Sequence, residues 1–138
     1  MAIISMQTMR YINLLDKTSN VKTRKCFVYN NTIFFAVPKN MISRAIGRAA
    51  INVKKLQERF GKKVKIIEEP GGAEDAEKFI RDIVEPVKFK SFEIRDGEMV
   101  IIAGGTQNKA ILLGRNKKRF EELKSIILDN FGAELRII

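Results

Sequence analysis

The sequence has 138 residues, of which 45% are hydrophobic, and its 26 Lys/Arg against 16 Asp/Glu give a formal net charge of +10. This apolar content supports a folded core and excludes wholesale disorder, and no apolar run approaches the roughly 18 residues of a membrane span. Histidine is absent and Cys26 is the single cysteine, which excludes a zinc site and removes the commonest general base. We therefore predict a non-enzymatic protein without a cofactor, in a reducing, cytoplasmic setting because no secretory signal is recognisable.

The positive charge is concentrated in one half of the chain. Residues 1–70 hold fourteen Lys/Arg and four Asp/Glu, whereas residues 71–138 hold twelve of each, so the net charges are +10 and zero. An excess of positive charge on one part of a small protein favours a polyanionic partner, usually a nucleic acid. The alternative is an ordinary solvated surface, which composition alone leaves open.

The first half contains a regular succession of secondary-structure patterns. Apolar residues at helical spacing, two β-rich runs joined by Asn30-Asn31, and a glycine turn at Gly47 mark its elements. Asn-Asn supplies the positive φ angles of a tight hairpin turn. The expected elements are a helix at 5–17, a hairpin at 27–37, helices at about 39–46 and 50–60, and a strand at 63–67.

The second half follows the same order. A linker, Glu69-Pro70-Gly71-Gly72, separates the halves. The elements expected after it are a helix at 73–84, a hairpin at 92–103 turning at Asp96-Gly97, helices at about 106–113 and 116–130, and a strand at 134–138. Thr106 is the expected N-cap of the helix at about 106–113.

The two halves are copies of one unit. The segment "FGKKVKII" at 60–67 aligns without a gap with "FGAELRII" at 131–138, and "AIGR" at 45–48 aligns with "LLGR" at 112–115. Both glycine turns lie between the last two predicted helices. We therefore predict an α/β (α+β) fold of two domains, 1–70 and 71–138, each αββααβ with a three-stranded sheet packed on helices.

This topology, with a glycine and a basic residue between the last two helices, resembles the type II KH domain, whose GXXG loop clamps the backbone of about four nucleotides. Two such domains in tandem are similar to the archaeal NusA-type transcription factors, most clearly over "AIGRAAINVKKLQERFGKKVKII". The chain departs from GXXG twice, because Ala50 and Lys117 stand where the family has its second glycine. We expect these two residues to open their helices in right-handed geometry.

The residues predicted to bind RNA surround the two glycine turns. A glycine lets the phosphate backbone approach, a following arginine donates to phosphate oxygens, and the N-terminus of the next helix favours an anion. For the first loop they are Arg44, Gly47, Arg48, Ala49, Ala50, Asn52, Lys54 and Lys55. For the second loop, predicted to be the weaker site because its domain is neutral, they are Gly114, Arg115, Asn116, Lys117, Lys118 and Arg119.

The resemblance implies a monomeric, non-membrane protein that acts in transcription termination or antitermination by contacting single-stranded RNA of the nascent transcript, with RNA polymerase as a further partner. Charge and spacing by themselves indicate only a nucleic-acid binder. Two alternatives stay open. One is a protein-interaction scaffold that docks on RNA polymerase, and the other is a KH-type factor of RNA processing or ribosome assembly.

Overall fold

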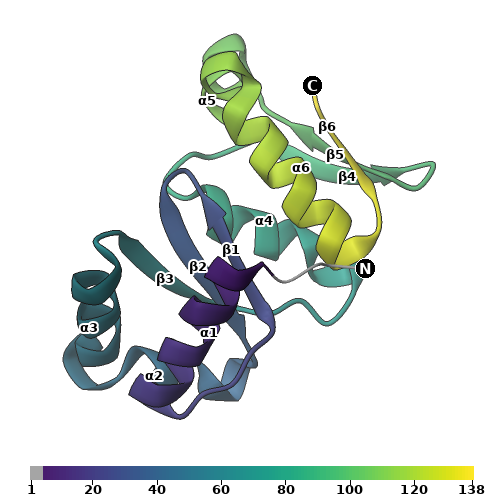
Figure 1. The fold of residues 1–138 in the computed structure, drawn as a ribbon. Coiled ribbons are helices and arrows are strands. Elements are labelled where there is room, and N and C mark those ends of the chain that lie inside the picture. Colours follow the sequence, from purple (N-terminus) through teal and green to yellow (C-terminus); the bar gives the residue numbers. More distant parts are fainter. Residues whose placement is uncertain (1–4) are drawn as a thin grey trace. The chain divides into compact units, whose positions relative to one another are not determined.

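The computed structural model describes residues 5–138, which divide into two compact units, one ending at Pro70 and the other running from Gly71 to Ile138. Each unit contains one three-stranded sheet and three α-helices in the order helix, strand, strand, helix, helix, strand (Figure 1). The predicted class, with two sheets packed on helices, is therefore confirmed. Short 3₁₀ turns precede most of the later helices.

The first unit forms its sheet from a hairpin and a crossover. Its elements are α1 (Met6–Ser19), β1 (Lys25–Tyr29), β2 (Thr32–Val37), α2 (Ile42–Ile46), α3 (Ile51–Phe60) and β3 (Lys63–Glu68), with 3₁₀ turns at Lys39–Met41 and Arg48–Ala50. The strand order is β1-β2-β3, with β1 antiparallel and β3 parallel to β2. Parallel neighbours need a long crossover, and here that crossover consists of α2, the glycine turn and α3.

The second unit repeats this arrangement. Its elements are α4 (Ala76–Val84), β4 (Ser91–Arg95), β5 (Glu98–Ile102), α5 (Thr106–Leu113), α6 (Lys118–Phe131) and β6 (Glu134–Ile137), with 3₁₀ turns at Ala73–Asp75 and Arg115–Lys117. The strand order is β4-β5-β6, with one antiparallel and one parallel pair. The second glycine turn therefore also lies in a crossover between parallel strands.

The core of the first unit lies between its helices and one face of its sheet. Leu15 of α1, Ala45 of α2 and Leu56 of α3 are completely buried in one cluster with alternate strand residues such as Ile33 and Phe35. Alternation along a strand points these side chains to a single face. Packing of this kind fixes the ends of α2 and α3, and so fixes the turn between them.

The second unit is held together by the apolar face of α4 and by α6. Phe79, Ile80 and Ile83 of α4 are at most 2% exposed. Phe79 also meets Phe131, at the end of α6, edge to face with ring centroids 5.7 Å apart. The i, i+1, i+4 spacing on α4 is the pattern of a helix that buries one stripe.

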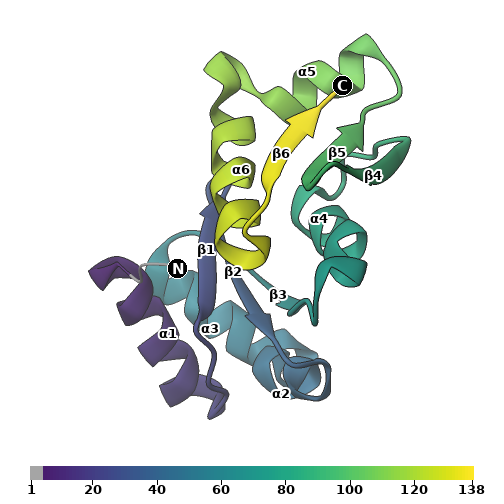
Figure 2. The same ribbon diagram turned by 90° about the vertical axis from the view of Figure 1, so that its right-hand side faces the viewer.

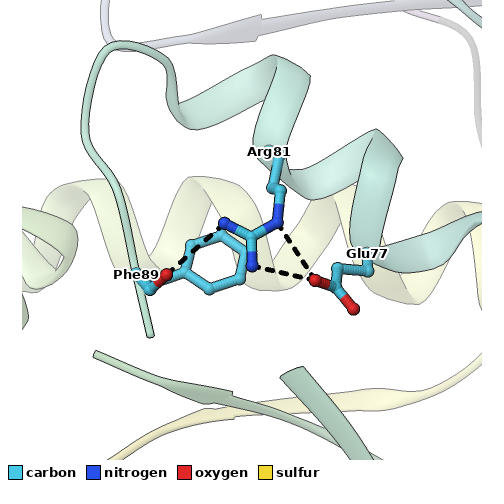
Figure 3. Close-up of polar contacts among 3 residues, drawn as sticks. All are labelled: Glu77, Arg81 and Phe89. Atoms are coloured by element: carbon cyan, nitrogen blue, oxygen red, sulfur yellow. Dashed lines mark hydrogen bonds and ion pairs between the residues drawn. The ribbon is translucent and has the colours of Figure 1, made fainter. Parts of the chain in front are cut away.

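Arg81 secures the segment that follows α4 (Figure 3). Its Nε and Nη2 donate to Glu77 Oε2 at 3.1 and 2.8 Å, while Nη1 donates to the carbonyl oxygen of Phe89 at 3.4 Å. The guanidinium carbon also lies 4.0 Å from the centroid of the Phe89 ring. One side chain therefore links the last turns of α4 to the residues that lead into β4.

The expected hairpin turns agree with the structure, and one expected helix cap does not. Asn30, Asn31, Asp96 and Gly97 all have positive φ, as predicted for the two hairpin turns. Thr106 is the first residue of α5 and makes no cap, because Gly105 takes the N-cap position without a side-chain hydrogen bond. Over residues 5–138, no helix combines the length and apolar character that crossing a membrane requires.

Candidate nucleic-acid interface

The first glycine turn is a tightly defined backbone structure between α2 and α3. Gly47 has φ 81° and ψ 166°, and Ala49 and Ala50 follow in the left-handed region with φ of 53° and 59°. The Gly47 N–H donates to Ser43 O at 2.9 Å, and the Ala50 N–H donates to Gly47 O at 3.0 Å. α3 begins only at Ile51.

The second glycine turn has nearly the same geometry. Gly114 has φ 75° and ψ 175°, and Asn116 and Lys117 have φ of 55° and 58°. The Gly114 N–H donates to Ala110 O at 3.0 Å, and the Lys117 N–H donates to Gly114 O at 3.1 Å. The two different sequences GRAA and GRNK therefore adopt the same backbone conformation. This indicates that packing of the flanking helices determines the loop conformation.

The expectation that Ala50 and Lys117 open their helices in right-handed geometry is wrong. Both residues are left-handed, so α3 and α6 start one and two residues later than predicted. Two successive left-handed residues are what turn the chain from one helix into the next. Each non-glycine residue in this region costs about 1–2 kcal/mol, and packing of the flanking helices offsets that strain.

Gly47 is required for space as well as for its dihedral angles. A Cβ atom at this position would lie 2.8 Å from Asn52 Nδ2 and 3.0 Å from Ile51 Cγ2. Asn52 Nδ2 in turn donates to the carbonyl oxygen of Arg44 at 3.1 Å. The Asn52 side chain thus ties the first turn of α3 to α2 across the bare face of Gly47.

Arg119 makes the matching link in the second unit. Its Nη1 donates to Ile111 O at 3.4 Å, and a Cβ on Gly114 would lie 2.9 Å from Arg119 Cβ. In both units the donor stands five residues after the glycine and the acceptor three residues before it. We call this contact the loop brace. Sequence reasoning placed Asn52 and Arg119 near RNA but missed the brace, whose only signal is their shared distance from the glycines.

The cations predicted around the first loop are available to a ligand. Arg44, Arg48, Lys54 and Lys55 are exposed, and none forms an ion pair with a described residue. α3 has no acidic residue in its first turn and no side-chain cap. The N-terminal end of α3 therefore combines unneutralised side-chain charge with the positive end of the helix dipole.

The second loop offers a weaker positive field. Arg115, Lys117 and Lys118 are exposed, but Glu121 lies in the first turn of α6. Arg119 is half-buried and donates within the loop brace. The structure therefore brings the predicted residues of each loop together, and the two sites differ in charge rather than in backbone geometry.

Parts of this chain are similar to known proteins. Residues 32–81, which run from β2 through the first glycine turn and β3 into α4, match the KH domain family. The chain is 38% identical over 77 residues to the "Probable transcription termination protein NusA" of Methanocaldococcus jannaschii, a match that covers 56% of this chain and 40% of that protein. The protein of the same name from Methanococcus vannielii is 30% identical over 95 residues, covering 69% of this chain and 48% of that relative.

A solved structure resembles the chain over nearly its whole length. The crystal structure of APE1850 superposes with a TM-score of 0.65 at 27% identity, covering 98% of this chain and 99% of that one. The matched segments of the two curated relatives, by contrast, span less than half of each protein. The structural match therefore spans nearly all of this chain, and the family match spans the segment that contains its first glycine turn.

Proposed function

We propose that this chain, whose residues 32–81 match the KH domain family and which is similar to two archaeal proteins named as probable NusA, binds single-stranded RNA through its first glycine loop. The RNA would be the nascent transcript, and the process transcription termination or antitermination. RNA polymerase is the protein partner included in this proposal. The second loop is proposed as a weaker contact for the same strand.

The observation that carries this proposal is the first loop itself. A glycine without a Cβ lies beside four exposed cations, Arg44, Arg48, Lys54 and Lys55, that form no ion pair with a described residue. In a unit with net charge +10, these cations supply the sequence-independent part of the affinity for a phosphate backbone. The left-handed residues hold the loop in one shape before any ligand arrives, which lowers the entropy cost of binding.

Each part of the loop has a proposed role in binding. Gly47 gives the loop its backbone path, with the Asn52 amide packed where a Cβ would lie, and the exposed Arg48 donates to phosphate oxygens. Ile51, which is 48% exposed directly after the loop, gives the unstacked bases an apolar surface. Ile46 and Val53, both half-buried, extend that surface, and base edges would be read there in the manner of other single-strand RNA modules.

Fluorescence anisotropy with a labelled single-stranded RNA tests this proposal directly. The variant Gly47→Asp/Arg48→Asp is compared with the matched Gly114→Asp/Arg115→Asp, which makes the same chemical change in the second loop. We expect a loss of affinity of at least about tenfold for the first and less than about threefold for the second. Circular dichroism of both variants checks that they remain folded. Absence of salt-dependent binding by the unmodified protein, or equal affinity of the first-loop variant, overturns the proposal.

Two further assays separate the alternatives. A pull-down of RNA polymerase that persists after nuclease treatment, in a protein without measurable RNA affinity, identifies a protein-interaction scaffold. Sequencing of RNA crosslinked to the protein in cells distinguishes diverse nascent transcripts from ribosomal RNA precursors. A predominance of the precursors assigns the protein to ribosome assembly rather than to transcription.

A further inference from the structure

In the first unit, α1 and α3 pack directly against each other (Figure 2). A positively charged depression lies between these two helices. One hollow of about 510 Å³ is lined by residues of both helices, including Arg10, Lys17 and Arg59. A second hollow of about 410 Å³ adds Lys55 and shares Leu14 and Arg59 with the first. We call the two together the α1–α3 groove.

The floor of the groove is apolar and well packed. Tyr11 of α1 meets Phe60 of α3 edge to face, with ring centroids 4.6 Å apart. The Tyr11 hydroxyl accepts a hydrogen bond from Gln7 Nε2 at 2.8 Å. Leu14 is half-buried and lines both hollows. The helices are therefore held at a fixed spacing, and the depression is a property of the folded unit.

The rim of the groove is strongly positive. Arg10, Lys17, Lys55 and Arg59 are all exposed, and none forms an ion pair with a described residue. Glu58 is the one carboxylate among the lining residues. Four Arg and Lys side chains from two helices, with one carboxylate beside them, are suited to bind a polyanion whose negative charges are spaced along a backbone.

The groove is distinct from the glycine loop but continuous with it along α3. α1 lies before residue 32, where the KH match begins, so one wall of the groove belongs to no part of that match. Lys55 is in the first half of α3, close in sequence to the loop, and Phe60 is its last residue. A ten-residue helix is about 15 Å long, so the groove leads away from the loop along the α3 surface.

We propose that the α1–α3 groove binds the sugar-phosphate backbone of the same RNA strand, beyond the nucleotides held at the first glycine loop. This inference rests on the proposed RNA binding at that loop. Continuity with the loop through Lys55 and the multiplicity of unpaired Arg and Lys favour RNA over an acidic protein segment. The contact is independent of base sequence, because its charged groups are long cations on an exposed rim.

Two RNA lengths distinguish the groove from the loop. A strand of about four nucleotides fills a KH loop, whereas one of roughly twelve nucleotides has backbone left over for the groove. The groove variant is Arg10→Gln/Lys17→Gln/Arg59→Gln. The control is Lys22→Gln/Arg24→Gln/Lys39→Gln, three exposed residues of the same unit outside the groove and the loop, which lowers the net charge equally.

The groove variant should bind the longer RNA about tenfold more weakly at 0.1 M salt and the shorter RNA within about twofold of the unmodified protein. Its slope of log affinity against log salt should fall by about 2 for the longer RNA, since each lost phosphate contact on a single strand contributes about 0.7. The control should remain within about twofold for both. Unchanged affinity of the groove variant for the longer RNA, or an equal loss for both RNAs, overturns the groove proposal.

Two other outcomes have separate meanings. If the unmodified protein binds neither RNA, the proposed function itself fails. If the groove variant loses affinity for a polyglutamate peptide while keeping its affinity for the longer RNA, the groove is a protein-docking surface and the RNA proposal is overturned.

Discussion

Replacing Ala50 with glycine should stabilise the protein, although glycine inside a helix is usually destabilising. Ala50 has φ 59° and ψ 29°, and an L-residue in this conformation costs about 1–2 kcal/mol. Glycine removes that cost but brings an entropy penalty of roughly 0.5–1 kcal/mol through the unfolded chain. The difference leaves a net gain of about 0.5–1 kcal/mol in the free energy of unfolding.

Thermal unfolding followed by far-ultraviolet circular dichroism measures this gain. For a unit of this size, the gain corresponds to a rise in Tm of about 2–8 °C. The matched control is Ala110→Gly, which changes an exposed alanine inside α5 and should lower stability by about 1 kcal/mol. Lys117→Gly, at φ 58°, should act in the same direction as Ala50→Gly.

The sign of the Ala50→Gly effect is the decisive result. A loss of stability comparable with that of Ala110→Gly would mean that residue 50 is helical and that the loop carries no left-handed strain there. RNA affinity should stay within about threefold, because glycine adopts the same left-handed conformation. A much larger loss would show that the alanine methyl group itself contributes to binding.

Three further predictions concern single side chains. Asn52→Ala removes the loop brace to the carbonyl oxygen of Arg44 and should lower the free energy of unfolding by about 1 kcal/mol. It should also weaken RNA binding without changing the slope of log affinity against log salt. Unaltered affinity in an RNA titration would exclude a positioning role for Asn52. Burial raises the pKa of Cys26 to about 12, so its thiol stays protonated in the folded protein while that of the unfolded chain ionises from about pH 9. The thiol should therefore leave the free energy of unfolding unchanged below about pH 9 and lower it by up to about 1.4 kcal/mol per pH unit as the pH rises toward 12. Urea unfolding at a series of pH values measures this slope. An equal slope for Cys26→Ala and the unmodified protein would contradict the prediction. Arg81→Met, which loses the hydrogen bond and ring contact to Phe89, should lower the Tm by several degrees with RNA affinity unchanged.

The fold could be predicted largely because its information is local and repeated. The apolar stripe of α4, the Asn30-Asn31 and Asp96-Gly97 turns, and the alternating last strands each follow from neighbouring residues. The two halves repeat the same order of elements, so each half of the sequence carries the same pattern independently. Thr106 was misassigned as a cap because Gly105 could also fill that position, and local propensity does not decide between adjacent candidates.

The candidate site was predictable in its residue types and less so in its geometry. The two glycines and the basic residues beside them were visible in the sequence, and their role in binding RNA remains a proposal. The brace from Asn52 to Arg44 joins α3 to α2 through two residues that are eight positions apart in the chain, and neither residue indicates that contact by itself. The α1–α3 groove brings Arg10 and Arg59 onto one depression, although they are far apart in the chain.

The sequence by itself determined the two-unit organisation, the class of fold and the concentration of charge in the first half, because periodicity, repeats and composition are properties of the chain. Only the tertiary structure decided the conformation of Ala50 and Lys117. Their local preference is helical, but the packing of α2 and α3, and of α5 and α6, sets where each helix must begin. The turn then takes the one backbone path that joins those ends, and it is left-handed in both units despite their different residues.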